Sequence, residues 1–230
     1  MVRSFLVQAS SFAADIDFVI DLIGVLVGFW FVLASCVFFY LILRFRSKDE
    51  GKAEWVTGEE KSQKRWITIP HILVLICDIF ILVGAVRVWV HVKQTMPEET
   101  TPVRIVAQQW AWTFVHAGPD GALDTDDDIV KIDELHVQKD VTYRYELSAL
   151  DVVHDFSVPV FRLKQDAVPG RVIEGWFKPT LAGEFDIQCA EMCGIGHGMM
   201  PAELFIETAE QHTAWMADHA PKSLAAVSAP

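Results

Sequence analysis

Residues 18–43 read "FVIDLIGVLVGFWFVLASCVFFYLIL", a run of 26 residues in which Asp21 is the single charged side chain. A second run of equal length, residues 67–92 ("ITIPHILVLICDIFILVGAVRVWVHV"), carries two charges, Asp78 and Arg87. As a helix rising about 1.5 Å per residue, each run reaches about 39 Å, which is enough to cross a bilayer. The two runs therefore predict a transmembrane hairpin.

The chain between the runs is basic. Residues 44–66 contain seven Lys and Arg, whereas the first 17 residues contain Arg3 alone. Short cytoplasmic loops are enriched in Lys and Arg, so we expect this loop in the cytoplasm and both termini outside. Residues 1–92 then form an N-terminal segment followed by the hairpin. Asp78 and Arg87 need partners there, because unpaired charge at membrane depth is costly.

Residues 93–230 read as an exported β-domain. Short runs with alternating or β-branched residues are separated by Gly, Pro and Asp clusters, which is typical of a sandwich or barrel. A short helix closes the domain, and Thr208 and Gln211 have the spacing of a capping box. The expected fold is an antiparallel β-sandwich or barrel attached to a two-helix membrane hairpin. The predicted strand runs are 103–115, 129–137, 141–149, 152–160, 171–179, 183–189 and 202–207.

Residues 189–200 read "CAEMCGIGHGMM" and gather soft metal-binding side chains on one short loop. A structural disulfide between Cys189 and Cys193 would not require His197 and Met200 beside it. Zinc is disfavoured because the spacing matches none of the usual finger patterns and Met is a poor zinc ligand. Cys, His and Met are the ligand types of a blue-copper site, which also needs a second His from the sheet. Copper therefore suits this loop best.

His154, in the run 152–160, can be that second His. One thiolate is then in excess, and two thiolates can bridge two copper ions, so that each ion has two sulfurs and one imidazole. Sharing one unpaired electron over two ions reduces ligand movement, which suits an electron relay. The other histidines have no ligand spacing and are expected at the surface, at interfaces or in the core: His71, His91, His116, His136, His212 and His219.

The pattern "H-x34-C-x-E-x-C-G-x-x-H-x-x-M" resembles the CuA motif of subunit II of the heme–copper oxidases, most of which are cytochrome c oxidases. The stretch at 158–171 resembles the family's segment after the first His, and the stretch at 180–189 resembles its lead into the Cys pair. The resemblance covers about residues 18–219. It implies a cupredoxin-like fold for the outer domain and a binuclear copper centre. The implied ligands are His154, Cys189, Cys193, His197, Met200 and the main-chain carbonyl of Glu191.

The resemblance assigns further roles. Trp110, in "QQWAW", is similar to the family's tryptophan through which electrons enter, and the Glu191 carboxylate to a ligand of a magnesium ion shared with subunit I. Asp151 matches a family aspartate near that interface. Two positions depart from the family pattern: Ala111 replaces an aromatic residue, and Gln63 replaces a Glu at the mouth of a proton pathway. These departures weaken any claim that the partner pumps protons in the familiar way.

The resemblance implies an electron-transfer subunit that accepts electrons from cytochrome c and passes them to heme in subunit I, where oxygen is reduced to water. Other oxidase subunits and the lipid membrane, in bacteria the inner membrane, complete the expected surroundings, and no nucleic acid partner is expected. From residue 93 onward, 22 Asp and Glu stand against 10 Lys and Arg, which would favour a basic donor.

Two alternatives remain open. A nitric oxide reductase of the same superfamily could use the same subunit, because the gas is reduced in subunit I, which also holds the heme. A membrane-tethered copper chaperone is less consistent with the sequence, since its His follows the cysteines at long distance and it needs only one span. Here His154 precedes the cysteines and His197 follows within four residues.

Overall fold

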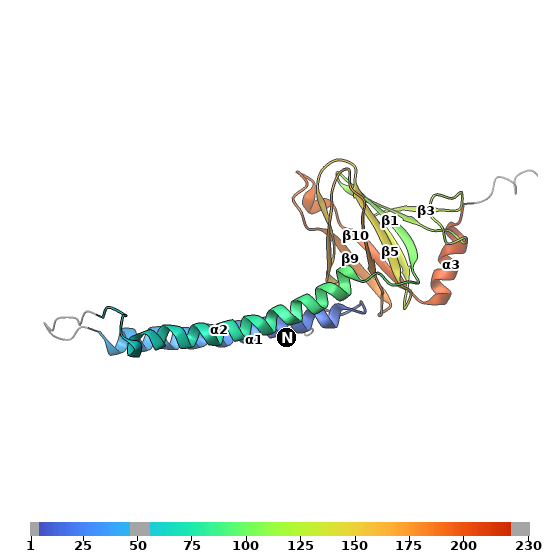
Figure 1. Ribbon diagram of the computed structural model, residues 1–230. Coiled ribbons are helices and arrows are strands. Elements are labelled where there is room, and N and C mark those ends of the chain that lie inside the picture. The colour runs from blue at the N-terminus through green and yellow to red at the C-terminus, as the bar shows by residue number, and fades with distance from the viewer. Residues whose placement is uncertain (1–4, 47–55, 222–230) are drawn as a thin grey trace, which may run out of the picture. The chain divides into compact units, whose positions relative to one another are not determined.

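The computed structural model describes residues 5–46 and 56–221, which form two units (Figure 1). Arg3 and part of the basic loop lie outside the described residues. One unit is a helical hairpin within residues 17–90, and the other is a β-domain that contains residues 5–16 and 91–221. The elements are α1 (Ala13–Arg44), α2 (Lys61–Trp89), η2 (Val90–Gln94), β1 (Thr101–Gln108), β2 (Ala111–His116), β3 (Ile129–Ile132), β4 (Glu134–Gln138), β5 (Tyr143–Ala149), β6 (His154–Val158), η3 (Pro159–Phe161), β7 (Leu163–Ala167), β8 (Ile173–Phe177), β9 (Gly183–Cys189), η4 (His197–Met199), β10 (Ala202–Glu207) and α3 (Ala209–His219).

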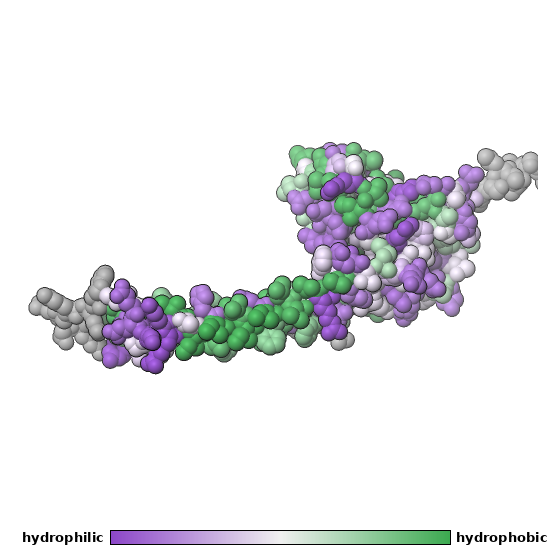
Figure 2. All heavy atoms as spheres, viewed as in Figure 1, coloured by the Kyte–Doolittle hydropathy of each residue, from purple (hydrophilic) through white to green (hydrophobic). Residues whose placement is uncertain are grey.

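The hairpin consists of α1 and α2, which contain the two predicted apolar runs except for residues 90–92, which belong to η2. Both helices are long and apolar enough to cross a membrane. The most apolar stretch of each helix is not buried against the rest of the described chain. Figure 2 shows apolar side chains along the hairpin. The helices α2 and α1 are in contact at Gly84, where an added Cβ would lie 3.7 Å from Val19, an ordinary van der Waals distance. A core helix of a soluble protein would instead be mostly buried.

The β-domain is the expected sandwich, made of two five-stranded sheets with the orders β3-β2-β1-β5-β8 and β4-β10-β9-β6-β7. Each sheet contains one parallel pair, β1 with β5 and β10 with β4, so the sheets are mixed where an antiparallel sandwich was expected. The predicted run 129–137 is two strands, and they belong to different sheets. Asp133, with a left-handed φ of 59°, turns the chain between them.

Alternating apolar residues of both sheets form the core between them. In β1 and β5 every second side chain is buried, as expected for a sheet with one face in the core. Phe156 of β6 lies at the centre, with its ring 5.6 Å from Trp112, 6.3 Å from Phe114 and 6.4 Å from Tyr145. These aromatic contacts join the two sheets. They also fix the position of β6, the strand that begins at His154.

The segment before α1 packs on the β-domain. The Ala9 amide donates to the Val160 carbonyl at 2.9 Å, and the Thr180 amide donates to the Ala9 carbonyl at 2.8 Å. Phe12 is fully buried, with its ring 5.3 Å from that of Trp176 in an edge-to-face arrangement. The β-domain is therefore built from chain on both sides of the hairpin.

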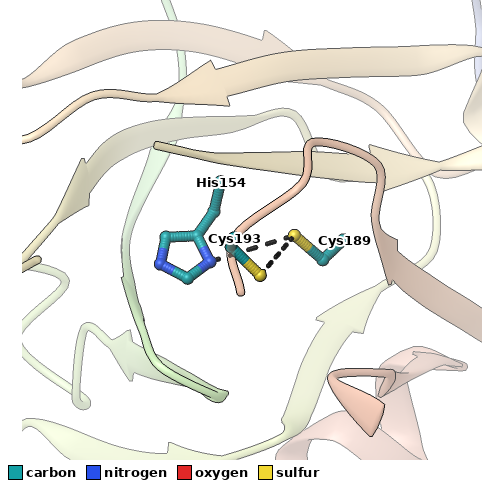
Figure 3. A group of neighbouring side chains, drawn as sticks. All are labelled: His154, Cys189 and Cys193. Carbon is teal, nitrogen blue, oxygen red and sulfur yellow. Dashed lines mark hydrogen bonds between the residues drawn. The ribbon is translucent and has the colours of Figure 1, made fainter. Parts of the chain in front are cut away.

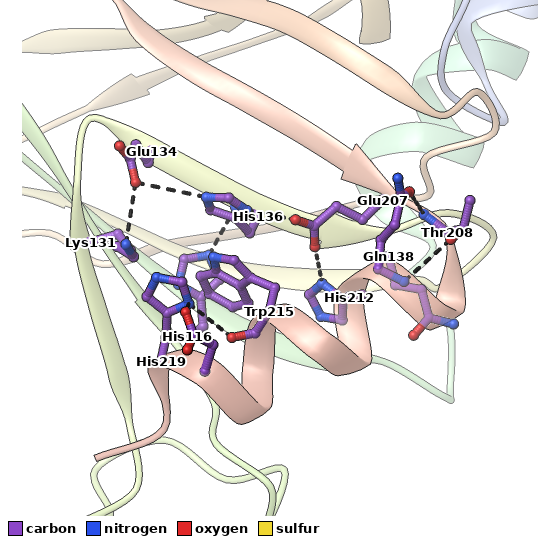
Figure 4. Close-up of polar contacts among 12 residues, drawn as sticks. His116, Lys131, Glu134, His136, Gln138, Glu207, Thr208, His212, Trp215 and His219 are labelled. Carbon is purple, nitrogen blue, oxygen red and sulfur yellow. Dashed lines mark hydrogen bonds and ion pairs between the residues drawn. The ribbon is translucent and has the colours of Figure 1, made fainter. Parts of the chain in front are cut away.

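The predicted helix at the C-terminal end is α3, and its capping box between Thr208 and Gln211 is confirmed. Trp215 of α3 lies among histidines (Figure 4), stacked 4.3 Å from His136 and edge-on 5.0 Å from His116. The buried His116 ring bridges three strands: Nδ1 lies 3.3 Å from the Ile129 carbonyl, and Nε2 accepts from the His136 amide at 3.1 Å. Both ring nitrogens are thus used by the neutral imidazole.

This arrangement predicts acid sensitivity of the β-domain. Burial lowers the pKa of His116 to about 3, so below about pH 6.5 the unfolded chain binds a proton that the folded domain refuses. Stability should fall as the pH decreases from 6.5 toward 3. His116→Gln keeps one donor and one acceptor but cannot titrate. We expect it to reduce the pH slope by up to one proton, about 1.4 kcal/mol per pH unit.

The measurement is the thermal unfolding of the full chain in detergent, followed by near-ultraviolet circular dichroism between pH 7 and pH 4. His91→Gln is a control, because the His91 ring packs on Trp176, whereas the His116 ring packs on Trp215 of α3. Equal pH slopes for the parent chain and His116→Gln would contradict the assignment.

Candidate metal centre

Two neighbouring strands present the first two ligand candidates. His154 is the first residue of β6, and Cys189 is the last residue of β9. The strands pair antiparallel, with Phe156 opposite Cys189, so the register brings both candidates to the same edge of the sheet. The chain then makes the loop to β10, which carries the remaining candidates.

Three side chains converge at this edge (Figure 3). One possible ligand atom from each of His154, Cys189 and Cys193 lies within 4.8 Å of the others. The two sulfurs are 3.7 Å apart, and His154 Nδ1 lies 3.9 Å from the Cys189 sulfur. Both cysteines are free thiols.

The loop adds one further donor beside each sulfur. His197 Nδ1 lies 3.6 Å from the Cys193 sulfur, and the Glu191 carbonyl oxygen lies 3.3 Å from the Cys189 sulfur. Met200 is 2 % exposed, at the point where the loop returns to the sheet. The structure thus gathers the two imidazoles, the two thiols and the carbonyl in one place and buries Met200 in the returning loop.

The donor set fits a soft transition metal. Two thiolates that bridge the same ions must lie closer than two metal–sulfur bonds, about 4.6 Å for bonds of about 2.3 Å, and the observed separation of 3.7 Å meets this condition. Thiolate, imidazole and thioether are the ligand types that favour copper over magnesium or calcium. The residues present could therefore hold copper.

Asp151 orients the first histidine. Its Oδ1 accepts from His154 Nε2 at 2.9 Å, which leaves the Nδ1 lone pair toward Cys189. Its Oδ2 accepts from the backbone amide of Gln109 at 2.7 Å. Burial alone would raise the pKa of Asp151, but the hydrogen bonds from His154, Gln109 and Val152 outweigh it and lower the pKa. The carboxylate therefore stays ionised beside the imidazole.

Burial also affects two other groups. It raises the pKa of Cys193 to about 11, with the neighbouring Cys189 thiol as the next cause. It raises the pKa of Asp155, next to His154, to about 6, and the hydrogen-bonded Asp166 carboxyl contributes to the rise. Without a cation, the site therefore disfavours negative charge. A bound metal ion would reverse this preference at the thiols, because its own charge stabilises thiolate.

The turn between β1 and β2 lies against the loop. Gln109 Nε2 donates to the Cys193 carbonyl at 2.8 Å, and Trp110 Nε1 donates to the same oxygen at 3.2 Å. Trp110 is 38 % exposed, so its indole reaches from solvent to a candidate ligand residue. A Cβ on Gly196 would overlap the Trp110 ring, whereas Gly198 has open space around it. The glycine at 196 therefore permits the close approach of loop and indole.

Two residues of this region were not predicted from the sequence. Gln109 contacts the Cys193 carbonyl, and Trp112 Nε1 donates to the Met200 carbonyl at 3.3 Å. Both stand in "QQWAW" beside Trp110, so the one available clue was the clustering of indoles and amides in that stretch. Their partners lie more than 80 residues away in the chain, which no local pattern indicates.

The fold and the candidate site together define a cupredoxin-like protein with two helices long and apolar enough to cross a membrane and a cysteine–histidine cluster that could hold a metal ion. The family described as "Cytochrome C oxidase subunit II, periplasmic domain" matches residues 115–207. The alternative cytochrome c oxidase subunit 2 of Bradyrhizobium diazoefficiens is 31% identical over 223 residues, which cover 87% of this chain and 79% of the relative. This chain belongs to the cytochrome c oxidase subunit II family.

Two further proteins are similar to this chain. Cytochrome c oxidase subunit 2 of Cereibacter sphaeroides is 24% identical over 91% of this chain and 77% of that protein. The crystal structure of the periplasmic domain of subunit II of cytochrome oxidase from Bradyrhizobium japonicum is 26% identical, covers 54% of this chain and 96% of that chain, and has a TM-score of 0.49. The relatives are thus subunits of an oxidoreductase complex.

The contact between Gly196 and Trp110 generates a prediction. Gly196→Ala should force the indole or the loop to move and should destabilise the β-domain by about 1–3 kcal/mol, the usual cost of overpacking. Gly198→Ala is the matched control and should be nearly neutral, because its added methyl group meets no atom within 4 Å. Thermal unfolding of the full chain and the fluorescence of the exposed indole provide the readouts. Equal unfolding temperatures for both variants would show that the loop moves away from the indole at no cost, which would contradict the prediction.

Proposed function

We propose that this chain is the electron-transfer subunit of a heme–copper terminal oxidase. It accepts electrons from a c-type cytochrome at a binuclear CuA centre and passes them to heme in subunit I, where oxygen is reduced to water. The observation that carries the proposal is the pair of free thiols 3.7 Å apart, with His154 beside one sulfur and His197 beside the other.

The arrangement supports two ions rather than one. Each cysteine has its own imidazole, and two weaker donors, the Glu191 carbonyl and Met200, remain for the outer positions. A mononuclear site of the blue-copper type needs one thiolate and would leave the second cysteine, whose sulfur lies 3.7 Å away, without a role as a ligand. Copper, when bound, supplies the one-electron redox chemistry, while the chain holds the donors and excludes water. Burial of Cys193 to 3 % exposure serves that exclusion.

Trp110 is the proposed point at which electrons enter. Its indole is partly exposed, and its Nε1–H group donates to the carbonyl of Cys193, which belongs to a ligand residue. Gly194 and Gly196 lie against the same ring. A donor that contacts the exposed edge of this indole is thus separated from a proposed ligand by one side chain and one hydrogen bond.

The surroundings follow from the family and from charge. The acidic balance of the outer domain favours a basic cytochrome donor. The carboxylate of Glu191, an exposed residue, is the proposed ligand of a magnesium ion shared with subunit I. The two apolar helices would cross the bacterial inner membrane, with the β-domain and both termini on the periplasmic side. Other oxidase subunits would surround the hairpin.

Nitric oxide could replace oxygen as the gas, because the gas is reduced in subunit I and the same residues of this chain would serve either reaction. Purification of the whole complex and measurement of oxygen against nitric oxide consumption distinguishes the two. A copper chaperone would show neither activity.

The binuclear assignment has a spectroscopic test. The copper-loaded full chain in detergent should give an electron paramagnetic resonance spectrum with hyperfine splitting from two equivalent copper nuclei. Cys189→Ser removes one bridge and should lose that pattern, either becoming mononuclear or losing copper. Cys36→Ser, in α1, is the matched control and should keep it. A single-copper spectrum from the unmutated chain would refute the binuclear centre.

The role of Trp110 has a kinetic test. Trp110→Gln should keep the copper content and spectrum, because no ligand is removed and Gln109 still donates to the Cys193 carbonyl. It should nevertheless slow electron transfer from reduced cytochrome c by orders of magnitude. In stopped-flow experiments the defect should persist at saturating donor. Loss of an acidic docking residue should instead weaken encounter, as added salt does, and should be overcome by more donor. A Trp110→Gln chain that loses copper or transfers electrons normally would refute the assignment.

A further inference from the structure

Trp112 lies between two proposed ligands that are distant in the sequence. Its side chain is fully buried in β2. The ring meets that of His154 edge-on, with centroids 6.2 Å apart, and that of Phe156 at 5.6 Å. On its other side, Nε1 donates to the Met200 carbonyl at 3.3 Å. One rigid side chain therefore contacts both the histidine at the start of β6 and the methionine at the end of the loop.

The backbone of Trp112 is itself fixed. Its amide donates to Asp133 Oδ1 at 2.7 Å, and its carbonyl accepts from the Asp133 amide at 2.8 Å. Asp133 is the left-handed residue that turns the chain between the two sheets. The indole is consequently held by both sheets, and its two torsions are restricted by a fully packed environment. Such a side chain can impose a position on its partners.

Met200 depends on that contact more than a strand residue would. It lies outside β10, which begins at Ala202, and the intervening Pro201 has no amide to donate. Its backbone angles, φ −115° and ψ 50°, do not belong to a regular strand or helix. The indole hydrogen bond therefore helps to define where the Met200 backbone, and with it the thioether, is placed.

The other buried indoles of the β-domain show that this hydrogen bond is not a general consequence of burial. Trp176 and Trp215 are 7% and 9% exposed, and the Nε1–H group of each is buried without a hydrogen-bond partner among the residues that the structure describes. Trp112 is thus distinguished by its partner, the backbone of a proposed ligand residue. Together with Trp110, which donates to the Cys193 carbonyl, it anchors the two ends of the loop 193–200.

We propose that Trp112 is a positioning residue of the metal centre: it fixes Met200 relative to His154 and thereby sets how strongly the weak thioether ligand acts on the metal. This inference rests on the proposed function. Axial thioether placement and the packing around the sulfur ligands tune the redox potential of copper–thiolate sites. Residues that orient ligands from the second layer typically change metal affinity by about 10- to 100-fold when they are replaced.

The test uses Trp112→Phe in the copper-loaded full chain in detergent. Phenylalanine keeps an aromatic ring against His154 and Phe156 but removes the Nε1–H group. We expect a shifted midpoint potential, an altered copper hyperfine splitting and a copper affinity about tenfold lower. Trp176→Phe is the matched control, because it loses a buried indole whose Nε1–H group has no partner. It should lower the unfolding temperature and leave potential and spectrum unchanged.

A double-mutant cycle shows whether Trp112 acts through Met200. In a Met200→Leu background the thioether is absent, so adding Trp112→Phe should produce little further shift of the potential. If Trp112→Phe does not fold, a tryptophan analogue with sulfur in place of the Nε1–H group at position 112 keeps the shape of the indole and removes only the donor.

The outcomes separate this inference from the function on which it rests. A single-copper spectrum from the unmutated chain would refute the binuclear centre. If the unmutated chain shows the binuclear spectrum, and Trp112→Phe or the sulfur analogue shows the same potential and splitting, Trp112 is a core residue only and the positioning role is wrong. Additive potential shifts in the double-mutant cycle would also contradict it.

Discussion

The 3.7 Å separation between the sulfurs of Cys189 and Cys193 is the constraint on which the site depends. Cys189 is fixed as the last residue of a paired strand, whereas Cys193 lies on a loop that has no ladder of its own. The loop is held instead by the turn between β1 and β2, where Gln109 and Trp110 both donate to the Cys193 carbonyl. Strand pairing of β9 thus positions the Cys189 sulfur. Side-chain hydrogen bonds from the β1–β2 turn, in the other sheet, position the Cys193 sulfur.

The same arrangement reconciles burial with access. A site that exchanges electrons must exclude water, and His154, Cys193 and Met200 are each 3 % exposed or less. The proposed electron donor must nevertheless approach, and Trp110 remains 38 % exposed while it contacts the loop. Gly196 permits this, because any side chain there would displace the indole. The missing side chain of Gly196 therefore leaves room for the indole of Trp110. The indole in turn connects the surface with the Cys193 carbonyl.

Much of this could be predicted from the sequence, since the deciding patterns are local. The apolar runs, the strand-like runs and the spacing of Cys189, Cys193 and His197 each lie within a few dozen residues. The rest depends on contacts between distant segments. The division of the run 129–137 between two sheets follows from a left-handed Asp133, and the packing of Phe12 on Trp176 joins chain from both sides of the hairpin. Propensity and periodicity do not carry such information.

Histidine shows why residue type alone cannot identify a ligand. In His116 both ring nitrogens are used by the backbone, Nδ1 toward Ile129 and Nε2 toward His136, so no lone pair remains for a metal ion. In His154 the carboxylate of Asp151 takes only Nε2, and Nδ1 is left facing Cys189. Both imidazoles are buried in the same domain. What separates a structural histidine from a candidate ligand is therefore the partner of the second ring nitrogen, and that partner is decided by the packing of the two sheets.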